Sequence, residues 1–168
     1  GTEWGLASVD PDSGAVMARD RAADALLDRS VTSFATDGAG NTWFGTSTSG
    51  ALRIGPEGTP TWIRRRADGV PWLNCNHVED ILLDSRGNLW FATVDLLDGG
   101  AYRLAPDGTW TLFQDPNVIG QPPTTILSNL VVDIAEDKAG NLWFVTDLGV
   151  SRLAPDGTWS YHLTAAGG

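Results

Sequence analysis

The stretch Asp84-Ser-Arg-Gly-Asn-Leu-Trp-Phe-Ala-Thr93 decides the fold, because the chain contains it three times. Its two counterparts are Asp37-Gly-Ala-Gly-Asn-Thr-Trp-Phe-Gly-Thr46 and Asp137-Lys-Ala-Gly-Asn-Leu-Trp-Phe-Val-Thr146. Each copy follows a short apolar segment that opens with valine, at Val31, Val78 and Val131. Self-similarity at intervals of 20 to 50 residues is the signature of a repeat architecture. The chain is therefore predicted to be a repeat protein.

Two further blocks complete each repeat. One has an arginine followed by a turn sequence of the type Ala-Pro-Asp-Gly, and the other is aromatic, as in Thr109-Trp-Thr-Leu-Phe113. Pro, Asp and Gly favour tight turns, while aromatic and β-branched runs favour strands. The tryptophans of successive copies, Trp43, Trp90 and Trp143, are 47 and 53 residues apart, near the length of a four-stranded propeller blade. We therefore expect an all-β fold, a β-propeller with four antiparallel strands in each blade.

The repeats divide the 168 residues into one partial β-propeller. Residues 31–63, 78–113 and 131–164 are predicted to be complete blades, and residues 1–19 the third and fourth strands of a preceding, incomplete blade. Three blades and two strands are fewer than the four blades of the smallest closed propellers. The sequence thus predicts an arc that is part of a larger propeller.

Composition excludes several classes of protein. Hydrophobic residues make up 42% of the chain, which is enough for a core, and the formal net charge is −10. Such a charge disfavours nucleic acid and anionic membranes as partners. No run of about 18 apolar residues predicts insertion into a membrane, and no stretch of this segment has the pattern of a signal peptide. The single cysteine, Cys75, excludes an internal disulfide.

The repeated string Asp-x-x-Gly-Asn-Leu-Trp-Phe-x-Thr, followed by Gly-x-x-Arg-Leu-x-Pro-Asp-Gly-Thr-Trp, resembles the two-component regulator propeller repeat. This resemblance implies a sensor domain of the kind found in bacterial hybrid histidine kinases, with an extracytoplasmic location, either periplasmic or secreted. The same pattern is also similar to streptogramin lyases, which are propeller enzymes. Unrelated activities occur on propellers, so the fold by itself selects none of them.

Connector lengths indicate where a site would lie. The first and second strands of each repeat are separated by a constant interval, and so are the third and fourth. The connections from second to third strand and from one repeat to the next vary in length. In an up-and-down blade these two variable connections share one end. Variable loops on a rigid scaffold are where binding sites usually lie, so this end is the expected binding face.

The expected site combines an aromatic platform with amides and carboxylates, a composition suited to a carbohydrate or another small polar ligand. Its candidate residues are Trp72, Asn74, Asn76, His77, Asp95, Asp98, Asn129 and Asp147. The alternative is that Trp72 fills a gap between blades and that the asparagines cap turns. His77 is open to an acid–base role or a structural one, because a general base needs a positioned partner.

The sequence predicts no catalytic residue, metal site or cofactor. The three recurring aspartates, Asp37, Asp84 and Asp137, are ascribed to turn capping rather than to metal binding. We therefore expect a non-catalytic binding, sensor or interaction module. The alternatives are a lyase of the streptogramin lyase type and a structural subunit that completes a larger ring. The end blades are expected to be covered by the rest of a larger propeller or by another protein chain.

Overall fold

The computed structural model describes residues 30–64, 73–115 and 125–163, and it confirms an all-β fold with three full four-stranded blades. The expected strands within residues 1–19 lie outside the described part. All twelve described elements are strands, and no described helix is long and apolar enough to span a membrane. The first blade holds β1 (Val31–Thr36), β2 (Thr42–Thr46), β3 (Gly50–Ile54) and β4 (Pro60–Ile63). The second holds β5 (Val78–Leu83), β6 (Leu89–Thr93), β7 (Gly100–Leu104) and β8 (Trp110–Phe113), and the third β9 (Val131–Glu136), β10 (Leu142–Thr146), β11 (Gly149–Leu153) and β12 (Trp159–Leu163).

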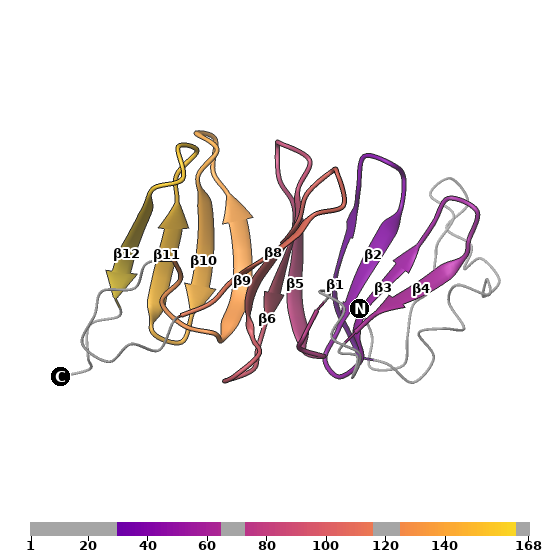
Figure 1. The fold of residues 1–168 in the computed structure, drawn as a ribbon, viewed down its shortest axis with the longest axis horizontal. Helices are drawn as coiled ribbons and strands as arrows, with labels where there is room; N and C mark the ends of the chain where they lie inside the picture. The colour runs from indigo at the N-terminus through magenta and orange to yellow at the C-terminus, as the bar shows by residue number, and fades with distance from the viewer. Residues whose placement is uncertain (1–29, 65–72, 116–124, 164–168) are drawn as a thin grey trace, which may run out of the picture.

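The strands of each blade pair in sequence order and antiparallel, so their connections alternate between two ends of the molecule. In Figure 1 the short turns β1–β2, β5–β6 and β9–β10, together with β3–β4, β7–β8 and β11–β12, lie along the upper edge. We call this edge the turn face. The β2–β3, β6–β7 and β10–β11 connections lie along the opposite edge, which we call the loop face.

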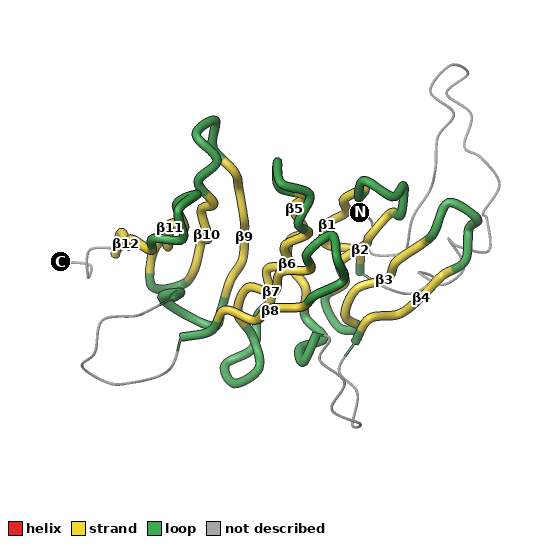
Figure 2. The backbone as a smooth tube through the Cα atoms, turned by 45° about the horizontal axis from the view of Figure 1, so that its top comes forward, coloured by secondary structure: helices red, strands yellow, loops and turns green. Residues whose placement is uncertain are grey.

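The three sheets stand side by side, as Figure 2 shows, and aromatic rings join them. Trp43 of β2 packs edge-on against Phe91 of β6, with 5.6 Å between ring centroids. Trp90 of β6 meets Phe144 of β10 in the same way, at 5.4 Å. Trp90, Phe91 and Phe144 are almost completely buried, and they belong to the two cores that lie between the blades. The second strands carry apolar residues on both faces because each is covered by a neighbouring sheet.

The repeated aspartate is the acceptor for the first turn of every blade. One carboxylate oxygen accepts the indole N–H of the tryptophan six residues later, at 2.8 Å in Asp37 and Asp84 and 2.9 Å in Asp137. The other oxygen accepts the backbone N–H of the asparagine four residues later, at 2.8–3.0 Å. The predicted turn-capping role is therefore confirmed. In the described ranges no three His, Cys, Asp or Glu side chains are arranged to hold a metal ion.

In Asp37 and Asp137 these hydrogen bonds favour the charged form of the carboxylate. Donors from Trp143 and Asn141 hold the pKa of Asp137 far below its ordinary value. Burial acts to raise the pKa of Asp37, but the hydrogen bonds from Trp43 and Asn41 outweigh it and the pKa is lowered. This part of the stability is present above the unfolded pKa of about 3.9 and is lost as the pH falls toward the folded value.

A threonine closes each connection between the second and third strands of a blade, on the loop face. The hydroxyls of Thr46, Thr93 and Thr146 donate to the carbonyl oxygens of Gly50, Gly100 and Gly149, at 2.8, 3.0 and 2.9 Å. The two partners are four, seven and three residues apart, so the same clamp spans loops of different length. These glycines have positive φ angles, and a Cβ on Gly50 would lie 2.3 Å from the carbonyl oxygen of Ile63.

Replacing Asp84 tests the first turn. Asp84→Ala leaves the buried indole N–H of Trp90 without its acceptor, so we expect a loss of about 2–3 kcal/mol in the free energy of unfolding. Urea unfolding followed by tryptophan fluorescence measures it. The matched control is Asp107→Ala, which removes an exposed turn aspartate whose Oδ1 accepts the Thr109 N–H. We expect a clearly smaller loss there, and equal losses in the two variants would contradict the assignment.

Candidate functional site on the loop face

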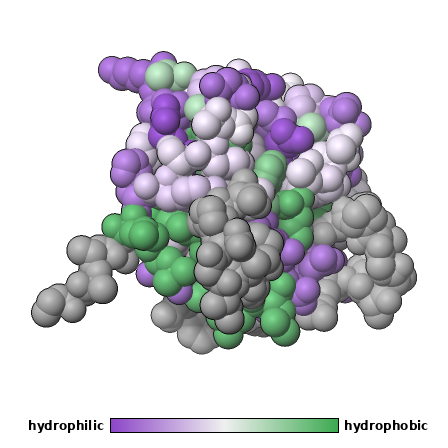
Figure 3. Space-filling view, turned by 60° about the vertical axis from the view of Figure 1, so that its left-hand side comes forward, coloured by the Kyte–Doolittle hydropathy of each residue, from purple (hydrophilic) through white to green (hydrophobic). Residues whose placement is uncertain are grey.

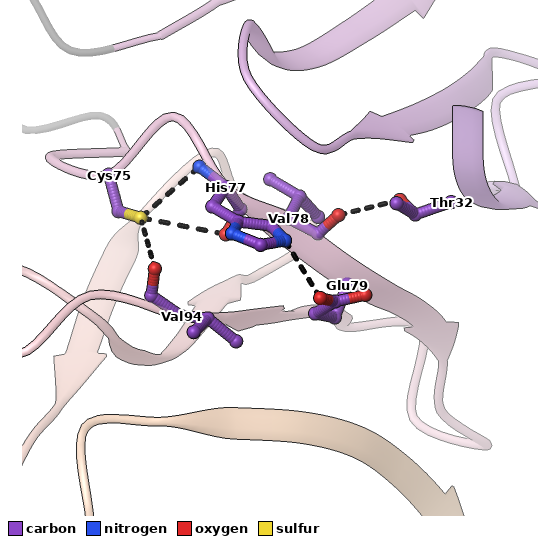
Figure 4. Close-up of polar contacts among 6 residues, drawn as sticks. All are labelled: Thr32, Cys75, His77, Val78, Glu79 and Val94. Carbon is purple, nitrogen blue, oxygen red and sulfur yellow. Dashed lines mark hydrogen bonds and ion pairs between the residues drawn. The ribbon is translucent and has the colours of Figure 1, made fainter. Parts of the chain in front are cut away.

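The connection that leads into β5 is fixed by the buried thiol of Cys75, which is 3% exposed. Figure 4 shows that its sulfur accepts the backbone N–H of His77 at 3.2 Å and lies 3.5 Å from the carbonyl oxygens of His77 and Val94. Burial raises the pKa of the thiol, so it stays protonated at neutral pH. Cys75 therefore ties the start of β5 to the end of β6 as a neutral, structural group.

His77 makes a close polar contact with a residue that sequence reasoning missed. Its Nε2 lies 2.7 Å from Oε1 of Glu79, and the two side chains are 36% and 34% exposed (Figure 4). The register of β5 shifts between Val78 and Asp80, so Glu79 occupies a β-bulge. Bulges re-aim side chains, and here the bulge brings a carboxylate to the imidazole. The same register shift recurs at the starts of β1 and β9. The bulge therefore has the same position in each sequence repeat.

The β6–β7 loop is held by the first of its two predicted aspartates. Oδ1 of Asp95 accepts the backbone N–H groups of Leu97 and Asp98, at 2.9 and 3.0 Å. The N–H of Gly99 donates to the Asp95 carbonyl oxygen at 3.1 Å. Leu96 and Leu97 are 72% and 80% exposed. The loop thus presents two leucines to solvent on a fixed backbone.

Side chains from three other segments hold the same loop. The hydroxyl of Tyr102 donates to the Asp98 carbonyl at 2.7 Å. Gln114 Nε2 donates to the carbonyls of Leu97 and Gly99, at 3.2 and 2.9 Å. Asn129 Nδ2 donates to the Leu96 carbonyl at 3.2 Å. Tyr102 and Gln114 were not predicted, because their roles depend on contacts between segments that no local pattern records.

The structure brings together only part of the predicted site. Asp95, Asp98 and Asn129 meet at the β6–β7 loop, and the backbone N–H of Asn74 joins them through the Tyr102 hydroxyl at 3.2 Å. The exposed side chain of Asn76 lies beside His77, and the Asn76 carbonyl accepts the Gly50 N–H. Asp147 is exposed in the separate β10–β11 turn, and Trp72 lies outside the described residues. No ligand tests these assignments, so a binding role for the eight residues stays a prediction.

Two segments match the model of the two-component regulator propeller, residues 73–95 and 125–147. Each match begins in the connection before a blade and ends on the loop face, so it contains one Asp–Trp turn and the threonine that begins one clamp. These two segments are therefore similar to two-component regulator propeller repeats. This confirms the resemblance inferred from the repeated string. No curated protein is similar enough in sequence to count as a relative.

Solved propellers share the fold of this chain at low sequence identity. One is the extracellular domain of BT3049, described as a hybrid two-component system of B. thetaiotaomicron, with a TM-score of 0.69, 17% identity and coverage of 82% of this chain and 19% of that one. Virginiamycin B lyase from Staphylococcus aureus gives a TM-score of 0.55, 16% identity and coverage of 81% and 42%. The chain thus spans less than half of either structure. These likenesses show the fold alone, so the lyase alternative also stays a prediction.

A carboxylate pair joins the second and third blades. Asp80 of β5 and Asp133 of β9 occupy equivalent positions, and both accept the backbone N–H of Ile134, at 3.2 and 3.0 Å. Burial raises the pKa of Asp80, and the neighbouring Asp133 raises it further. Asp80 therefore binds a proton more tightly in the folded protein than in the unfolded chain.

Replacing Asp80 with its neutral isostere tests this pair. Because the folded pKa is raised, the free energy of unfolding falls as the pH rises from about 3.9 through the folded value, and the penalty remains at pH 7. Asp80→Asn removes the penalty, so we expect a more stable protein at pH 7 and a smaller difference at pH 3. Denaturant unfolding at both pH values measures it, with the exposed Asp147→Asn as the matched control. A destabilised Asp80→Asn variant at pH 7 would contradict this reasoning.

Proposed function

We propose that this chain is a non-catalytic propeller module of an extracytoplasmic sensor and that it binds its ligand or partner through the loop face. The observation that carries the proposal is the β6–β7 loop, which exposes Leu96 and Leu97 while its backbone is held by Asp95, Gln114 and Asn129. The likeness to the extracellular domain of BT3049 supports the sensor assignment and the location.

A rigid loop with exposed leucines suits binding for two physical reasons. Most of the entropy of ordering the loop is already lost in the free protein, so association need not offset it. Burial of the two leucines then contributes about 1.5–3 kcal/mol each. Figure 3 shows hydrophobic surface gathering toward the loop face, while the turn face is hydrophilic. Leu148 and Leu163, 50% and 72% exposed, also lie at strand ends on the loop face.

The chemistry of the face favours a partner that combines apolar and polar groups. The leucines supply the apolar contact, and the exposed His77–Glu79 pair beside Asn74 and Asn76 supplies hydrogen bonds. A protein loop or peptide with an apolar side chain fits both. A carbohydrate or another small polar ligand would use the second group together with the predicted platform, Trp72.

The end blades supply a separate surface for association, and we propose that further propeller blades or another protein chain cover it. Phe91 and Phe144 are each covered by the tryptophan of the preceding blade. Phe44 occupies the same position in the first described blade, where its ring neighbour is Phe34 of its own sheet at 6.4 Å. Phe34 is 68% exposed, an apolar ring that a covering blade would bury.

Site-specific photo-crosslinking tests the loop-face proposal. A photoreactive residue at position 97 is expected to capture a defined partner in cells that express the full protein. The same residue at position 138 is the matched control, because Lys138 is exposed in the β9–β10 turn on the opposite, turn face. The double variant Leu96→Ala, Leu97→Ala should weaken binding of the captured partner at least tenfold without changing the melting temperature. Equal capture at both positions, or unchanged affinity of the double variant, would reject the proposal.

A further inference from the structure

A cleft between the first and second blades is lined by two tryptophans and an arginine. Its volume is about 220 Å³, and its walls come from the outer halves of the two sheets. The first blade contributes Trp43, Arg53, Thr61 and Ile63, and the second Leu104, Gly108 and Trp110. Gly108 is exposed in the β7–β8 turn, so the cleft reaches the protein surface there.

The same place between the second and third blades is filled by a phenylalanine. Strand registers make Phe113 the equivalent of Ile63, since Ala51 pairs with Ile63 and Ala101 with Phe113. The Phe113 ring lies between two tryptophans, 5.4 Å from Trp90 and 5.8 Å from Trp159. Trp43 and Trp110 are the equivalents of these two tryptophans, and both pack on Phe91 as Trp90 and Trp159 pack on Phe144.

The first junction therefore repeats an aromatic cluster from which one ring is missing. Ile63 is too short to reach the position that the Phe113 ring occupies, and the cleft is the space that remains. An engineered apolar cavity of about 150 Å³ is large enough to bind benzene. The size and the walls of the cleft thus match one six-membered aromatic ring, in tilted contact with both tryptophans.

Arg53 at the cleft favours a ligand with a negative charge. Arg53 and Arg103 are equivalent, and each guanidinium lies about 6 Å from an aromatic centroid, that of Trp43 or Phe113. Arg103 Nη2 donates to Thr111 at 3.1 Å. In the described ranges Arg53 makes no such bond, and its Nε, like that of Arg103, is buried without a hydrogen-bond partner. A guanidinium that lies beside an empty aromatic slot is suited to accept a carboxylate, which it can bind through two parallel hydrogen bonds.

We propose that this cleft binds a small aromatic carboxylate, with the ring between Trp43 and Trp110 and the carboxylate on Arg53. The ring takes the place that Phe113 fills in the next junction. The carboxylate supplies the acceptor that Arg53 lacks. The site is separate from the loop face, because its lining comes from β2, β3, β4, β7 and β8 and it opens at the β7–β8 turn.

Calorimetric titration of the full protein with sodium benzoate tests the site, with benzyl alcohol as the neutral probe. We expect saturable binding of benzoate and binding at least tenfold weaker for benzyl alcohol, because a hydrogen bond to a charged group is lost. Arg53→Gln should abolish the preference for benzoate. Absence of saturable benzoate binding, or a preference that survives in Arg53→Gln, would overturn the proposal.

Two substitutions exchange the side chains at the equivalent positions 63 and 113. They test the site with variants in which folding is checked separately by the melting temperature. Ile63→Phe supplies the missing ring, so benzoate binding should fall at least tenfold while the melting temperature is kept or raised. Ile63→Val, the matched control, should retain binding. Phe113→Ile opens the equivalent place between the second and third blades and should add a second benzoate site. Unchanged binding in Ile63→Phe, or a single site in a folded Phe113→Ile variant, would contradict the proposal that the ligand ring takes the place of a phenylalanine ring.

Discussion

The tryptophan of each second strand is the residue on which the rest of the structure depends, because it satisfies two constraints at once. Its indole N–H is bound to the aspartate of the first turn, and in the first two described blades its ring packs against the phenylalanine of the next blade. The hydrogen bond fixes the angle of the ring, and the ring fixes the distance between sheets. Turn geometry and blade packing are thereby coupled, and a defect in one is transmitted to the other.

This coupling leaves two regions of the molecule free to differ between blades. On the loop face the connections differ in length and carry exposed side chains. On the outer strands one position differs, two residues after the threonine that pairs with arginine. It is Ile63 in the first blade and Phe113 in the second. The aromatic framework is the same in both junctions, so a change of one side chain converts a filled junction into a cleft. Function in such a chain is expected where the repeat is broken.

The architecture could be predicted from sequence because every blade repeats the same local signals. The Asp-x-x-Gly-Asn turn, the Leu-Trp-Phe strand and the Pro-Asp-Gly turn each state a conformation that nearby residues determine. The candidate site was harder to predict from the sequence. The role of Asp95 is local, within two or three residues, whereas Tyr102 also accepts the distant Asn74 N–H and Asn129 donates to Leu96, 33 residues away. Glu79 faces His77 because of a bulge, and the cleft at Ile63 becomes visible only when two junctions are compared in space.

The threonine clamp has a consequence for how such a chain can change over time. Because Thr46 and Thr93 close their loops on glycine in the same way across separations of four and seven residues, added residues leave the paired strands in register. Doubling the length of a flexible loop costs only about 0.6 kcal/mol in closure entropy. Insertions at this edge are therefore nearly neutral for folding, and a lineage can acquire a new specificity by lengthening one loop while the parental scaffold is inherited intact.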